Sequence, residues 1–153
     1  MTNIQSDTEF KAALSAMSVT EQRQVGRLFV EHVIGLSDNP AVGKTLMAGD
    51  IAGLTDDEIA SAYKTTRSAA IESYTLCGHD GDWIKQASHF VASAAAACFT
   101  PADQAVKCND IAWSAAMNAR MAKVCESVAH STGNDDSEAR SQYGILTSFL
   151  QAV

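Results

Sequence analysis

Residues 87–129 read ASHFVASAAAACFTPADQAVKCNDIAWSAAMNARMAKVCESVA. Drawn at 3.6 residues per turn, this stretch places alanine on nearly every helical face, which is typical of helices that pack closely on other helices. It also contains three of the four cysteines and one of the two tryptophans of the chain. The stretch predicts two long helices, from Trp83 to about Phe99 and from Ile111 to about His130, with a tight core of small side chains.

Helix-start patterns recur outside this stretch. Ser18 with Glu21, and Thr55 with Glu58, have the spacing of a capping box, in which each side chain bonds the backbone N–H of the other residue. Valine and isoleucine seldom alternate with polar residues, so strands are not indicated. The remaining helices are predicted at about residues 7–17, 19–36, 40–47, 56–77 and 136–150.

Proline and glycine mark the boundaries between these helices. Pro40 and Pro101 each follow a polar residue, an arrangement that favours proline at the first position of a helix. Gly78 has the position of a helix C-cap, and residues 79–82 are predicted to turn the chain. On either side of this turn, we expect Tyr74 and Trp83 to face inward.

These elements predict an all-α, compact single-domain helical bundle of six or seven helices that spans residues 1–153. A length of 153 residues is common for one domain. At this size roughly two-thirds of the surface of the unfolded chain becomes buried. No linker rich in proline, glycine or serine divides the chain.

Charge and termini narrow the choice of partners. The net charge of −7 and the pI near 4.9 argue against nucleic acid and anionic membranes, because both require clustered lysine and arginine. The N-terminus has neither the basic nor the apolar region of a signal peptide, and no apolar run approaches the roughly 20 residues of a membrane span. We therefore expect a cytoplasmic protein with reduced thiols.

The cysteines suggest packing more than metal binding. No CxxC, HxxxH or Glu-x-x-His motif is present, which argues against zinc and di-iron sites. Cys77 and His79 are the only tight Cys/His pair, so they are the metal or redox candidates. Cys98 and Cys125 are expected to act as small buried hydrophobes.

Six polar or aromatic residues are candidates for binding a ligand. His32 lies on an apolar face, a position that suits either an axial ligand for a tetrapyrrole or a core histidine. His89 belongs to a polar stripe that could form a small binding surface. Asn118 lies on a face that looks buried, where its amide needs partners from a ligand or from the helix at 56–77, which offers Tyr63, Thr66, Arg67 and Ser73. The set is His32, Tyr63, Arg67, His89, Trp113 and Asn118.

No catalytic set and no cofactor motif appears in the sequence. The leading hypothesis is a non-enzymatic cytoplasmic interaction or regulatory protein that forms a homodimer, with the Met117 face of the 111–130 helix near the contact. The alternative is a helical bundle that binds a small ligand or cofactor. A third hypothesis is a thiol-dependent or redox-active protein that uses Cys77.

Overall fold

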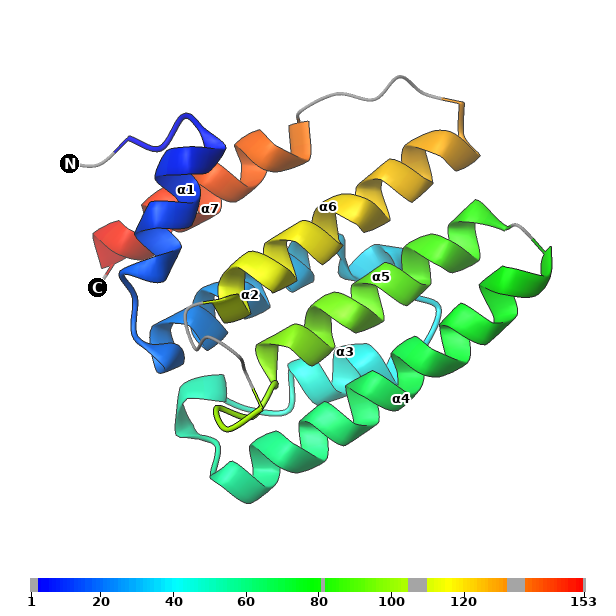
Figure 1. The fold of residues 1–153 in the computed structure, drawn as a ribbon, viewed down its shortest axis with the longest axis horizontal. Helices are drawn as coiled ribbons and strands as arrows, with labels where there is room; N and C mark the ends of the chain where they lie inside the picture. The colour runs from blue at the N-terminus through cyan, green and yellow to red at the C-terminus, as the bar shows by residue number, and fades with distance from the viewer. Residues whose placement is uncertain (1–2, 81, 105–109, 132–136, 153) are drawn as a thin grey trace.

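The computed structural model describes residues 3–80, 82–104, 110–131 and 137–152, apart from the side chains of residues 75–80. All regular structure in these ranges is helical, which confirms the predicted all-α bundle (Figure 1). Two short 3₁₀ turns, η1 (Ile34–Leu36) and η2 (Ile51–Gly53), flank α3. The α-helices are α1 (Asp7–Ser15), α2 (Val19–Val33), α3 (Pro40–Leu46), α4 (Asp56–Asp80), α5 (Trp83–Cys98), α6 (Ile111–Ala129) and α7 (Ser137–Ala152).

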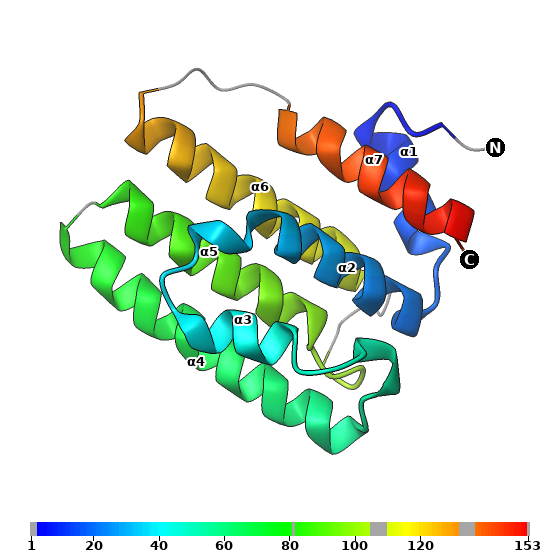
Figure 2. The same cartoon turned by 180° about the vertical axis from the view of Figure 1, so that it is seen from behind.

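The helices form two layers. Helices α4, α5 and α6 lie side by side and antiparallel in one layer (Figure 1). Helices α3, α2 and α7 lie behind them, as the opposite view shows (Figure 2). Helix α5 is central because it contacts α4, α6, α2 and α3. Helix α4 lies at the edge of its layer, so one of its long sides has no helical neighbour in that layer.

The predicted capping boxes are confirmed. The backbone N–H of Glu21 donates to Ser18 Oγ, and that of Ser18 donates to Glu21 Oε1, both at 3.1 Å. Thr55 and Glu58 bond each other in the same way at the start of α4. These bonds satisfy N–H groups that the first turn of a helix leaves without a partner.

Two predicted boundaries are wrong. Helix α4 continues through Gly78 to Asp80, and Asp82 caps α5 by accepting from the backbone N–H of Ile84 at 3.0 Å. Pro101 does not open a helix. Instead, Gln104 N–H donates to the Pro101 carbonyl at 2.9 Å in a turn. In both cases a glycine or proline signal is compatible with more than one local structure, and the neighbouring contacts decide between them.

The core has two parts that share α2 and α6. One part lies under α3 and α4, and the buried alanines of α5 form its centre. The other lies under α1 and α7 and contains Phe10, Leu14, Phe29 and Leu146. The small side chains predicted for residues 87–129 therefore form the middle of the bundle, and larger apolar side chains fill its two sides.

Helices α2, α5 and α6 lie close together at Gly26. A methyl group added at Gly26 would lie 3.1 Å from Cys98 Sγ and 3.5 Å from Ala115 Cβ. Glycine and alanine are needed here because a larger side chain would push the helices apart. Within the described ranges, no helix combines the length and the hydrophobicity that a transmembrane span requires.

A polar network joins α1, α6 and α7. Arg120 donates to both carboxylate oxygens of Asp7, at 2.8 and 3.1 Å, and to Gln142 Oε1 at 2.8 Å. The Tyr143 hydroxyl donates to Asp7 Oδ1 at 2.7 Å. The hydrogen bond from Arg120 lowers the pKa of Asp7 below its ordinary value of 3.8.

We expect Asp7→Asn to lower the free energy of unfolding by about 0.5–1 kcal/mol at neutral pH, because the half-exposed pair is screened by solvent. The carboxyl pKa is lower in the folded chain than in the unfolded chain. Its contribution is therefore present above pH 3.8 and is lost as the pH falls through the folded-state pKa. The difference in unfolding free energy between the native chain and Asp7→Asn should therefore shrink at acidic pH. Urea unfolding of both proteins at neutral and acidic pH measures this difference. Glu72→Gln, on the exposed side of α4, is the control, and a difference independent of pH would contradict the assignment.

Candidate functional site

A pocket of about 400 Å³ opens on the surface of the α4–α5–α6 layer. Its volume is within the range of small-molecule sites in proteins. Alanines 70, 96 and 97, together with Ile71, form the aliphatic part of its lining. The larger and polar side chains around them include Tyr63, Arg67, Tyr74, His89, Ser93 and Ser114.

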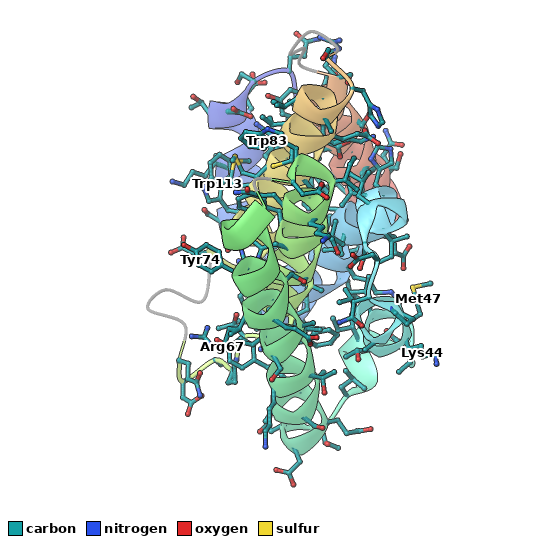
Figure 3. The ribbon with its side chains drawn as sticks, turned by 90° about the vertical axis from the view of Figure 1, so that its right-hand side faces the viewer. Lys44, Met47, Arg67, Tyr74, Trp83 and Trp113 are labelled. Carbon is teal, nitrogen blue, oxygen red and sulfur yellow. The ribbon has the colours of Figure 1, made fainter. Side chains whose placement is uncertain are left out.

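The helical repeat explains why this lining forms. Tyr63, Arg67, Ile71 and Tyr74 are spaced by three or four residues, so they project from one face of α4. On the facing side, α5 presents small residues that let the helices approach but fill little space above them. The long side chains of α4 thus form a wall beside a shallow alanine floor. Figure 3 shows Arg67 and Tyr74 projecting to the same side of α4, away from α3.

Arg67 is positioned by its neighbour one turn earlier. Its Nη1 donates to the Tyr63 hydroxyl at 3.1 Å, and its guanidinium carbon lies 5.9 Å from the centre of the Tyr63 ring. A guanidinium group has five N–H donors in a fixed fork. In the described part of the chain, Tyr63 accepts from one of them, so further donors can reach a ligand.

His89 of the pocket makes one hydrogen bond and two ring contacts. Its Nδ1 lies 2.7 Å from the carbonyl oxygen of Ala70, which links α5 to α4. Its ring centre lies 5.4 Å from that of Tyr74 and 5.2 Å from that of Phe90. Ring contacts on two sides and one short hydrogen bond fix the orientation of the imidazole.

The pocket differs in charge from the chain as a whole. The chain has 18 acidic residues and 11 basic ones, yet the described lining includes no aspartate or glutamate. It does include the cation of Arg67. An anionic ligand therefore meets a local positive charge on a protein whose net charge is negative.

The structure brings together three of the six predicted ligand-binding residues: Tyr63, Arg67 and His89. Asn118 lies one turn of α6 beyond Ser114 of the lining, and its Nδ2 donates to the Ser114 carbonyl at 2.9 Å. Its amide is thus bonded within its own helix and not to the α4 side chains that the sequence suggested.

His32 and Trp113 lie elsewhere. His32 Nδ1 is 3.0 Å from a carboxylate oxygen of buried Glu138, and this contact joins α2 to α7. The His32 side chain is 41% exposed, so it is not the core histidine that its apolar neighbours suggested. The Trp113 ring lies 6.1 Å from that of Phe10 and has the Lys11 amine 5.0 Å from its centre, so it packs against α1.

The metal or redox candidates Cys77 and His79 have side chains outside the described part of the structure. Among the described residues, no group of three potential metal ligands is present. Cys98 and Cys125 are buried, as the sequence predicted. Burial raises the pKa of Cys98 to about 12, so this thiol stays protonated and is a poor nucleophile.

The predicted ligand set omits other aromatic and polar residues of the lining, among them Tyr74, Thr100 and Ser114. Tyr74 was expected to face inward, but its side chain is 64% exposed. The same error holds for Trp83, which is 46% exposed. Helical spacing groups Tyr74 with Tyr63 and Arg67 on one face of α4, and this grouping was the available signal. It does not say whether a neighbouring helix covers that face.

Comparisons with protein-family models, with curated proteins and with solved structures find no match for this chain. The geometry and charge of the α4–α5–α6 pocket are therefore the basis for a functional proposal.

Proposed function

We propose that this chain is a binding protein for a small organic acid with a planar apolar body, and that the α4–α5–α6 pocket is its site. The observation that carries the proposal is the convergence of Tyr63, Arg67 and His89 on one pocket that has no acidic residue in its described lining. The sequence independently indicates these three residues as ligand candidates.

Each part of the pocket suits one part of such a ligand. The guanidinium of Arg67 matches a carboxylate, since the two groups form charge-assisted and often paired hydrogen bonds. The alanine floor and the rings of Tyr63 and Tyr74 suit a flat apolar body. The hydroxyls of Ser93 and Ser114 have no hydrogen-bond partner among the described residues and so can bond further polar groups.

The proposal is binding without catalysis. Within the described lining, no hydrogen bond joins His89 to the hydroxyl of Ser93 or Ser114, so a nucleophile activated by a base is not assembled there. The imidazole instead bonds a backbone carbonyl. This hydrogen bond suits a role for His89 in recognising a ligand from a fixed position.

Benzoate, with uncharged benzamide as its counterpart, tests the proposal by calorimetric titration. We expect benzoate to bind more tightly than benzamide. Arg67→Gln should weaken benzoate binding about tenfold, the value of one charge-assisted hydrogen bond. Lys64→Gln removes the same charge from an exposed position of α4 outside the lining and should leave the affinity within about twofold. Equal binding of the two compounds, or equal effects of the two variants, would contradict the proposal.

Self-association is a second candidate. Trp113 and Met117, on the face that the sequence favoured for a dimer contact, pack against the core under α1 and α7. Sedimentation equilibrium tests self-association, and a mass of 16.2 kDa at every concentration would contradict it. The observation in its favour is a set of exposed apolar side chains on α4, α5 and α6: Ile71, Tyr74, Trp83, Ile84, Met121 and Val128.

A further inference from the structure

The hydrogen bond from His89 determines which ring nitrogen can accept a hydrogen bond from a ligand. A backbone carbonyl oxygen can only accept, so the contact of 2.7 Å to Ala70 requires a proton on Nδ1. In the neutral imidazole the other nitrogen, Nε2, then carries no proton and is a hydrogen-bond acceptor. The rings of Tyr74 and Phe90 hold this orientation.

The acceptor and the cation line the same pocket. Arg67 projects from α4, and His89 of α5 is tied to α4 by its hydrogen bond to the Ala70 carbonyl. A ligand in this pocket can therefore place a carboxylate at Arg67 and a second polar group at His89.

A metal ion is a poor match for Nε2. Stable metal sites use several protein ligands, typically three or four for zinc. Among the described residues, His89 belongs to no group of three histidine, cysteine or acidic side chains. A hydrogen-bond donor on an organic ligand is the partner that a single fixed imidazole nitrogen suits.

We propose that the pocket selects acids that also carry an O–H or N–H donor on their apolar body, and that His89 Nε2 accepts this hydrogen bond. The inference rests on the proposed function and adds a second recognition element to it. His89 is then a specificity-determining residue, because a ligand without the donor leaves a desolvated acceptor without a partner.

The first test reads the tautomer without any ligand. A long-range proton–nitrogen NMR spectrum of the ¹⁵N-labelled full chain, recorded at mildly alkaline pH, distinguishes a protonated ring nitrogen from an unprotonated one. We expect the His89 signals to show a proton on Nδ1 and none on Nε2. The reverse pattern would overturn the inference and would leave the Arg67 test of the proposed function intact.

The second test compares 4-hydroxybenzoate with 4-methoxybenzoate, which differ in the donor. The native chain should prefer the hydroxy acid about tenfold, as expected for a buried acceptor that is otherwise unpaired. His89→Phe retains an aromatic ring but has no acceptor nitrogen. This variant should bind the two acids with about equal affinity and should still bind unsubstituted benzoate. A preference that persists in His89→Phe would overturn the role of His89. Failure of benzoate and both of these acids to bind the native chain would instead overturn the proposed function.

Discussion

Phe10→Ala is expected to lower the free energy of unfolding by about 3–5 kcal/mol, the range measured for the loss of a fully buried phenylalanine. Phe10 has no exposed surface, and its ring lies 5.4–6.1 Å from the rings of Phe29, Trp113 and Tyr143. These neighbours belong to α2, α6 and α7. The substitution would therefore remove one of the contacts that hold α1 to three other helices.

Denaturant unfolding followed by circular dichroism measures this loss. Tyr74→Ala is the matched control, because it also removes an aromatic ring but from an exposed position. It should cost about 1 kcal/mol or less. Equal effects of the two substitutions would show that α1 does not contribute to the core in this way.

Ala115→Leu is expected to cost about 1–3 kcal/mol by overpacking. Ala115 is fully buried on α6 and faces Gly26 of α2, next to Cys98 of α5. Three additional carbon atoms cannot be placed there unless the helices separate. The same unfolding experiment measures the change in midpoint.

Ala60→Leu provides the control for this substitution. It makes the same change at an exposed position of α4, where leucine and alanine have similar helix propensities, and it should change stability by no more than about 0.5 kcal/mol. An Ala115→Leu variant as stable as the native chain would contradict the close packing of α2, α5 and α6.

Much of the fold could be predicted because its determinants are local. The capping residues Ser18 and Thr55 act within one helical turn, so sequence spacing alone reveals them. The pairing of helices depends on distant residues. Asp7 and Arg120 are 113 positions apart, and His32 and Glu138 are 106 apart. No local pattern in the sequence encodes such pairs.

The candidate site was predictable in part for the same reason. Tyr63 and Arg67 are one turn apart on one helix, so the sequence places them together. Tyr74 shares their face, but whether that face is buried depends on the position of α4 at the edge of its layer. The pocket itself results from the meeting of this face with alanines of α5. That meeting is a property of the assembled bundle.

An NMR titration that maps a bound acid on the chain tests the proposed function most directly. Benzoate added to the ¹⁵N-labelled protein should shift the backbone amide signals of Ala70, His89, Ser93 and Ala97, which surround the pocket. The signals near His32 and Glu138, on the opposite layer, should stay unchanged and serve as the internal control. Shifts confined to those control positions, or no shifts at any pocket residue at millimolar benzoate, would contradict the assignment of this pocket as a ligand site.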